Sequence, residues 1–330
     1  RQLPALKITV RSAAPLALLQ QRIHCDFQHH PVALDFGMRM ASAVEVQVAE
    51  SAAAYRQFHA DWARRVAREA QIMRALRPDL LLANVPYLSL AAAHQAGVRS
   101  VGMCCLNWAD IYRHYCVEDA ASQAIHAQML EAYNSAECFL KVQPTMPMPD
   151  FASVRSISPI AHLGRSQRAR IAAHAALHEA EKWVLVAMGG MELRLPMEQW
   201  PHLPGVHWLV PQAWGIARHD VTAFETLGVP FSDVLASCDA TLTKPGYGTF
   251  AEAACAGVPV LYVTRRNWPE EPYLVQWLKQ HGVCLEVERE ALQGGELADL
   301  LQQLWAQHPP PRPQPDGAAE AAQYLRDTYF

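Results

Sequence analysis

The feature that most constrains this chain is the stretch Asp239 to Leu274, which predicts two strands joined by a glycine turn and a helix. The β-rich run Ala240 to Thr243 leads into the turn KPGYG, and Thr249 is expected to open a helix of small residues. Gly257 is expected to end this helix, because glycine readily adopts the left-handed conformation found after a helix end. Val260 to Val263 is expected to form the second strand. The stretch therefore predicts a βαβ unit, with two parallel strands flanking one helix.

The start of this helix is a predicted anion site. The free N–H groups and the positive end of the helix dipole at Gly248 to Ala251 can hold an anion such as a phosphate. Gly246 and Gly248 carry no side chain that would keep backbone amides away from the anion, and Lys244 adds a cation to the loop. A tight turn that serves the chain path alone would also explain both glycines.

Strand and helix patterns alternate along the rest of the chain. Leu80 to Ala83, Ser100 to Cys104 and Cys138 to Val142 are predicted strands with helical segments between them. This alternation favours parallel sheets with helices on both faces. A single helix is expected from Ala49 to Arg77, because its apolar residues recur at every third or fourth position. A second glycine turn follows the predicted strand Trp183 to Ala187.

The length of the chain predicts two domains. Its 330 residues exceed the roughly 250–300 residues at which one hydrophobic core stops growing. Prolines accumulate between Gln143 and Arg165, which we interpret as the connection. We expect a first domain over residues 1–150, a second over 151–310, and a proline-rich spacer with a returning helix over 311–330. A doubly wound domain normally opens with a strand and a glycine loop, so about 20 residues are expected before Arg1.

The composition excludes several classes of protein. A net charge of -4 and the absence of a Lys/Arg run argue against nucleic-acid binding. The sequence contains neither an apolar run of about 18 residues nor a signal-peptide pattern, so no transmembrane helix is expected. The eight cysteines include no CxxC pair, which indicates reduced thiols and a cytoplasmic protein. These observations do not exclude peripheral contact with a membrane surface.

Several motifs are spread over nearly the whole chain. They are KPGYGTFAEAACAGVPVLYV, RRNWPEEPYL, DVLASCD, LDFGM, WADIY and DGAAEAAQYL. With these motifs the chain resembles the GT-B superfamily of nucleotide-sugar glycosyltransferases, and its donor half is similar to that of the MurG-type transferases. It looks closer still to the glycosyltransferase-like N-terminal region of plant arabinokinase-type proteins and their bacterial relatives. Nothing in the chain resembles the sugar-kinase half of the arabinokinases.

The resemblance implies an α/β fold of two Rossmann-like doubly wound domains facing a cleft, with the C-terminal helix crossing back to the first domain. It also implies that the second domain binds a nucleotide-diphosphate sugar, with a UDP-sugar as the default. The donor-binding residues that we expect are Gly189, Gly190, Lys244, Gly246, Tyr247, Gly248, Thr249, Glu252, Arg265, Arg266, Glu270 and Glu271.

Several of these residues have competing interpretations. The resemblance implies that Glu252 binds the ribose hydroxyls, but Thr249 and Glu252 also have the spacing of a helix capping box. Glu270 and Glu271 follow a strand end, where related enzymes bind the donor sugar; general acid–base chemistry or a solvated loop would also account for them. The adjacent Arg265 and Arg266 could offset diphosphate charge or form an exposed basic pair.

The motifs point to the catalytic base less specifically than to the donor-binding residues. Asp35 in LDFGM and Asp110 in WADIY are candidates to orient or deprotonate an acceptor hydroxyl, although capping and turn roles are common for aspartate. The resemblance implies that the base often comes from the first glycine loop, which is absent from this sequence. The pair His29–His30 has no third ligand at metal-binding spacing, and we interpret it as a surface loop pair.

We therefore expect a metal-independent, inverting glycosyltransferase without a cofactor. The sequence contains no Asp-x-Asp motif, the usual diphosphate-metal motif of the other major glycosyltransferase fold. The acceptor is an unidentified small molecule or glycan with a hydroxyl group. The same fold also supports nucleotide-sugar epimerases, hydrolases and non-catalytic binding proteins, which remain alternatives.

Overall fold

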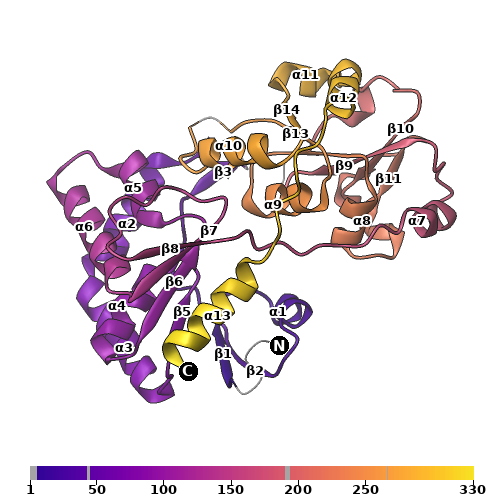
Figure 1. The fold of residues 1–330 in the computed structure, drawn as a ribbon. Helices are drawn as coiled ribbons and strands as arrows, with labels where there is room; N and C mark the ends of the chain where they lie inside the picture. The colour runs from indigo at the N-terminus through magenta and orange to yellow at the C-terminus, as the bar shows by residue number, and fades with distance from the viewer. Residues whose placement is uncertain (1–5, 43–44, 190–193, 266) are drawn as a thin grey trace.

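The computed structural model describes residues 6–42, 45–189, 194–265 and 267–330. The chain forms two α/β halves, each built on its own parallel sheet, as the alternating pattern predicted (Figure 1). Residues 158–165 lead from the first sheet to the second, and the last helix returns to the first (Figure 1). None of the described helices is both long and apolar enough to cross a bilayer.

The first half contains a four-stranded parallel sheet in the order β5-β6-β7-β8. Its strands are β5 (Leu81–Ala83), β6 (Ser100–Cys104), β7 (Cys138–Val142) and β8 (Val154–Ile157). The helices of this half are α2 (Val48–Ala60), α3 (Trp62–Leu76), α4 (Tyr87–Ala96), α5 (Trp108–Cys116) and α6 (Ala120–Asn134). Strand β8 pairs with β7, so the first sheet extends past residue 150.

Two small sheets complete this half. Strands β1 (Ile8–Arg11) and β2 (Phe27–His30) form a parallel pair with helix α1 (Leu16–Arg22) between them in sequence, and β3 (Met40–Ser42) pairs antiparallel with β4 (Glu45–Val46). The histidines expected in a surface loop lie in β2 instead. His29 pairs with Val10, and its side chain is half-buried while that of His30 is exposed, because successive residues of a strand face opposite sides.

The single helix predicted over Ala49 to Arg77 is two helices. Asp61 leaves the helical conformation between α2 and α3, with φ −111° and ψ 24°. Aspartate has a low helix propensity because its side chain competes for backbone hydrogen bonds, so a break is least costly there. Arg77 ends α3 in the left-handed conformation before Pro78.

The second half contains a six-stranded parallel sheet in the order β11-β10-β9-β12-β13-β14. Its strands are β9 (Lys182–Ala187), β10 (Val206–Val210), β11 (Val221–Ala223), β12 (Ala240–Thr243), β13 (Val260–Tyr262) and β14 (Cys284–Glu286). Its helices are α7 (Arg168–Ala175), α8 (Phe231–Ser237), α9 (Tyr247–Ala256), α10 (Glu271–His281), α11 (Arg289–Gly294) and α12 (Ala298–Trp305), with 3-10 turns η1 (Met197–Gln199), η2 (Gln212–Trp214) and η3 (Phe224–Leu227).

Both faces of this sheet are buried, which explains why its strands are continuous apolar runs. Alternate residues of β9 enter different cores. Trp183 and Leu185 pack with residues of α7 to α10, whereas Val184 and Val186 pack with residues of α11 and α12. The strand order brings the ends of β9 and β12 side by side, with Ala187 opposite Thr243.

The last helix, α13 (Gly317–Tyr329), crosses back to the first half, as predicted (Figure 1). Ala321 and Leu325 pack on the face of the first sheet that carries Val101 and Leu140. A Cβ atom on Gly317 would lie 2.0 Å from the carbonyl oxygen of Ser158, so only glycine fits where α13 meets the connecting segment.

Candidate functional site

Two glycine turns lie side by side at the carboxyl ends of β9 and β12. Gly189 follows β9 with φ +80°, a conformation that favours glycine. A Cβ atom at Gly189 would lie 3.5 Å from Cε of Lys244, which follows β12. The structure therefore brings these two predicted donor residues together. Gly190, predicted with Gly189, lies outside the described residues.

The first turn of α9 is open to solvent. Gly246 precedes the helix in an extended conformation, and no side chain caps it. Gly248 is exposed, and a Cβ atom on it would have no neighbouring atom within 4 Å. Because the first amides of a helix lack intrahelical partners, this end has both the donors and the space for an anion.

The capping box proposed as an alternative for Thr249 and Glu252 is not formed. The helix begins at Tyr247, so Thr249 lies within the first turn and does not cap it. The prediction that Thr249 opens the helix was wrong because Gly246, in its extended conformation, already ends the preceding turn. Glu252 is half-buried, and the backbone of His162 in the connecting segment lowers the pKa of its carboxyl group, against the larger rise that burial causes.

Glu252 lies where α9 meets the connecting segment. Burial raises the pKa of its carboxyl group, and the positive charge of Arg22 on α1 opposes this rise. Tyr247, one turn earlier, is also engaged there. Its hydroxyl accepts a hydrogen bond from the Ile160 amide at 2.8 Å and lies 3.2 Å from the Ile160 carbonyl. The side chain of Tyr247 thus holds α9 against the connection between the two halves.

A cavity of about 440 Å³ lies between the two halves. It is lined from the first half by Asp35, Phe36, Gly37, Met38, Met40 and Trp108, and from the second half by Lys244, Arg265 and Trp268. Three of the predicted residues therefore meet at one cavity, two cations from the second half and one carboxylate from the first.

The two cations follow neighbouring strands, Lys244 after β12 and Arg265 after β13. Burial lowers the pKa of Lys244, and the charge of Arg265 lowers it further. The guanidinium of Arg265 lies 4.9 Å from the ring centre of Trp268. A cavity that holds two partly desolvated cations is suited to an anionic ligand.

Asp35 and Asp110 differ in what surrounds them. The Asp35 carboxylate lines the cavity and accepts a 2.8 Å hydrogen bond from the indole N–H of Trp108. Burial raises its pKa, an effect that this hydrogen bond partly offsets. The buried Asp110 carboxylate, in the first turn of α5, accepts hydrogen bonds from the side chains of Asn107 at 2.9 Å and Arg113 at 3.0 Å. The contacts of Asp110 therefore stabilise helix α5, and Asp110 is not among the residues that line the cavity.

Glu270 and Glu271 are both buried, with 5% of each residue exposed, and they have separate partners. Glu271 accepts the backbone N–H of Arg265 at 3.0 Å and its Nε at 3.3 Å, and burial raises the pKa of Glu271. Glu270 accepts the Cys105 thiol at 3.2 Å and the Trp268 indole N–H at 3.1 Å. Glu271 therefore orders the loop after β13, whereas Glu270 joins the two halves.

Sequence reasoning missed Trp268, Trp108 and Cys105 as individual residues. The first two belong to the motifs RRNWPEEPYL and WADIY, and Cys105 follows β6 directly. Their position after strand ends was an available signal, because such loops meet at the carboxyl edge of a parallel sheet. Arg266, predicted beside Arg265, lies outside the described residues.

Comparison of sequences relates this chain to a plant protein. No protein-family model matches the chain. The L-arabinokinase of Arabidopsis thaliana is 25% identical over 281 residues, which cover 79% of this chain and 25% of that protein. The chain thus spans about a quarter of that relative's length.

Solved glycosyltransferase structures share the fold over nearly the whole chain. VinC in complex with DTDP has a TM-score of 0.54 and 21% identity, covering 92% of this chain and 84% of its own. The glycotransferase of kitacinnamycin has a TM-score of 0.59 and 17% identity, with coverage of 98% and 87%. SnogD from Streptomyces nogalater has a TM-score of 0.53 and 17% identity, with coverage of 98% and 99%.

At these identities the likeness establishes the arrangement of the chain. Two parallel-sheet halves, a cavity between them and a last helix that returns to the first half are all present in this structure. The chain has the GT-B fold of the glycosyltransferases.

Proposed function

We propose that this protein is a glycosyltransferase that moves a sugar from a nucleoside-diphosphate sugar to a hydroxyl group of an acceptor. The observation that carries the proposal is the cavity between the halves, lined by Lys244 and Arg265 on one side and by Asp35 on the other. Two cations suit a diphosphate, and the half-buried carboxylate of Asp35 suits proton removal. The GT-B relative VinC, which binds DTDP, supports the same donor class.

The second half binds the donor in this proposal. The diphosphate lies at the first turn of α9, where Gly246 and Gly248 leave the amides accessible, and Lys244 and Arg265 balance its charge. Glu252 binds the ribose. A UDP-sugar is the default donor, and the DTDP of VinC makes a thymidine diphosphate sugar the first alternative.

Glu270 and Glu271 act near the sugar in this proposal. Both carboxylates already accept hydrogen bonds from the protein, Glu270 from Trp268 and Glu271 from Arg265. A carboxylate has about four lone-pair positions, so each can also accept a sugar hydroxyl. The two residues position the donor and take no part in proton transfer.

The first half supplies the base. Asp35 takes the proton of the acceptor hydroxyl while that oxygen attacks the anomeric carbon, and the bond from this carbon to the diphosphate oxygen breaks with its electron pair leaving on the diphosphate. Attack from the side opposite to the leaving group inverts the anomeric configuration. The hydrogen bond from Trp108 keeps Asp35 oriented.

Metal-independent transfer is part of the proposal. The two cations and the dipole of α9 supply positive charge where negative charge develops on the leaving diphosphate. We expect an excess of chelator to leave the initial rate unchanged. A cytoplasmic location is also proposed, because all eight cysteines are free thiols.

The test is incubation of the protein with UDP- and TDP-sugars, with and without a panel of hydroxyl acceptors. Release of nucleoside diphosphate that requires an acceptor, together with a glycosylated product, supports the transferase. Release without acceptor indicates a hydrolase, and interconversion of the sugar indicates an epimerase. Binding of the nucleotide without turnover indicates a non-catalytic binding protein, and each of these three outcomes contradicts the proposal.

A further inference from the structure

A second cavity, of about 270 Å³, lies at the edge of the six-stranded sheet opposite to the donor turns. Its lining residues include Glu181, directly before β9, His207 in β10 and Asp220, directly before β11. All strands of this sheet are parallel, so their amino ends share one edge. The two glycine turns follow the carboxyl ends of β9 and β12. The second cavity is therefore remote from the proposed transfer reaction.

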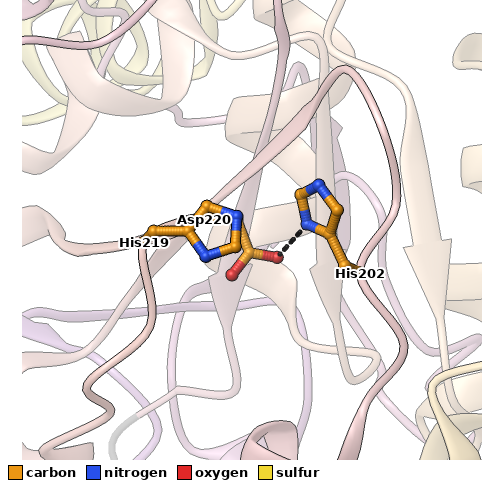
Figure 2. A group of neighbouring side chains, drawn as sticks. All are labelled: His202, His219 and Asp220. Carbon is orange, nitrogen blue, oxygen red and sulfur yellow. Dashed lines mark hydrogen bonds and ion pairs between the residues drawn. The ribbon is translucent and has the colours of Figure 1, made fainter.

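His202, His219 and Asp220 converge at this cavity (Figure 2). Their ligand atoms all lie within 4.8 Å of one another. His202 comes from the loop after η1, whereas the other two directly precede β11. Figure 2 shows the carboxylate of Asp220 directed toward the ring of His202, and the centres of the two imidazole rings are 4.8 Å apart.

The spacing of these atoms is close to what a metal ion requires. Nδ1 of His202 lies 3.2 Å from Oδ2 of Asp220. Two ligands bound tetrahedrally to zinc at about 2.0–2.1 Å are separated by roughly 3.3 Å, so these two atoms need almost no movement. The imidazole of His219 has to move closer by a side-chain rotation, which its exposed position permits.

Asp220 is held in place for this role. Arg218 donates to both carboxylate oxygens, at 2.9 Å to Oδ1 and 2.6 Å to Oδ2, and also donates to the carbonyl oxygen of Trp200 at 2.9 Å. Only 3% of the Asp220 side chain is exposed. A carboxylate that binds a metal is usually oriented by such outer hydrogen bonds. Metal at Oδ2 would replace the hydrogen bond to His202 and leave the contacts of Arg218 in place.

We propose that His202, His219 and Asp220 form a binding site for a first-row transition-metal dication such as Zn²⁺. Imidazole and carboxylate are ligands that such ions accept, and the adjoining cavity leaves room for water as the fourth ligand. The bound ion joins the loop after η1 to the start of the edge strand β11. Its role is structural, since the site lies at the amino edge of the sheet.

The charge of Arg218 sets the strength of the site. The guanidinium already compensates the Asp220 carboxylate, and no thiolate is among the three ligands. We therefore expect weaker binding than in a closed structural zinc site with several thiolates. The alternative is a network in which Arg218 and His202 are only hydrogen-bond partners of Asp220, without a metal.

The test is a zinc titration of the whole chain against a chromophoric chelator at neutral pH. Wild-type protein should bind one Zn²⁺ per chain. His202→Ala and His219→Ala should each lower that affinity at least about tenfold, since losing even an outer partner of a ligand costs 10- to 100-fold. His174→Ala is the matched control, because His174 is an exposed histidine of α7 outside the cluster. It should bind zinc like wild type.

A second readout separates loss of the site from loss of the fold. Zinc should raise the melting temperature of wild type and His174→Ala by about 2 °C or more, but not that of the two ligand variants. Both variants should melt like wild type when zinc is absent, because both side chains are exposed. Failure of wild type to bind stoichiometric zinc, or equal zinc binding by the ligand variants, would overturn the proposal.

Discussion

At the scale of the residue, environment separates two aspartates that look alike in sequence. Asp35 lines the cavity between the halves, and burial raises its pKa. Asp110, in the first turn of α5, accepts hydrogen bonds from Asn107 just before the helix and from Arg113 in its last turn. Each aspartate lies in a short motif and is followed by an apolar residue. Neither motif indicates whether the side chain of its aspartate faces a cavity. Contacts with other parts of the chain decide that.

Replacement of the proposed base tests this distinction. We expect Asp35→Asn to lower kcat/KM at least about a hundredfold, because general base catalysis contributes roughly 10²–10⁴-fold. Nucleotide affinity should stay near the wild-type value. Asp110→Asn is the matched control, and it should lower the melting temperature while kcat/KM of the folded protein changes little. Similar losses of kcat/KM in both variants would remove Asp35 from the role of base.

The raised pKa of Asp35 predicts the acid limb of the pH profile. The base works only when its carboxyl group is ionised, so kcat/KM should fall as pH decreases through the pKa of Asp35. Burial raises this pKa, so the fall should begin above the range of an ordinary aspartate, whose pKa is about 3.9. Measurement of kcat/KM against pH checks this, with circular dichroism to establish that the protein stays folded. An acid limb at an unshifted pKa would contradict the assignment.

At the scale of the element, the first turn of α9 combines an ordinary helix start with an unusual glycine. Gly248 lies inside the helix, where alanine would be more stable, yet a Cβ atom there would meet no other atom. Its side chain position is open on the side where we place the diphosphate. Folding does not need this glycine, so binding of the donor is the better explanation for it.

Gly248→Ala should therefore separate binding from stability. We expect the free energy of unfolding to increase by about 0.5–1 kcal/mol, since alanine favours the helix. The affinity for nucleoside diphosphate should fall about tenfold or more, because the new methyl group occupies space next to the anion. Calorimetry and denaturant unfolding measure the two effects. Unchanged affinity would mean that the diphosphate does not lie at this turn.

At the scale of the whole molecule, the segment between the halves is held at several points. Tyr247 bonds to Ile160, and Glu320 of α13 accepts the Ser158 amide at 2.8 Å. The amide of Gly317 donates to the carbonyl of Pro159 at 3.1 Å. The elements of both halves therefore meet on one short segment, and the relative position of the halves depends on it.

Gly317→Ala tests the tightest of these contacts. The new methyl group would overlap the carbonyl oxygen of Ser158, so we expect α13 to shift and the free energy of unfolding to fall by about 1–3 kcal/mol. Gly248→Ala serves as the comparison, because it makes the same change in the first turn of another helix where space is available. Thermal unfolding of both variants checks this. A Gly317→Ala protein as stable as wild type would show that α13 adjusts at no cost.

Much of the fold was predictable because its signals are local. The run of apolar residues over Trp183 to Ala187 predicted a strand buried on both faces, and the turn around Gly246 predicted the helix start to within a few residues. The break at Asp61 and the strand at His29 were not predicted, since each depends on small differences in propensity or on pairing with a distant strand.

The sequence by itself determined the alternation of strands and helices and the glycine turn that leads from β12 into α9, because these follow from patterns within a few residues. Only the tertiary structure decided which loops meet. It joined Glu270 to Cys105, put Asp35 in the same cavity as the two cations, and gathered His202 with Asp220 at the opposite edge of the second sheet. The physical reason is that such contacts depend on the order and direction of strands, which bring together residues far apart in the chain.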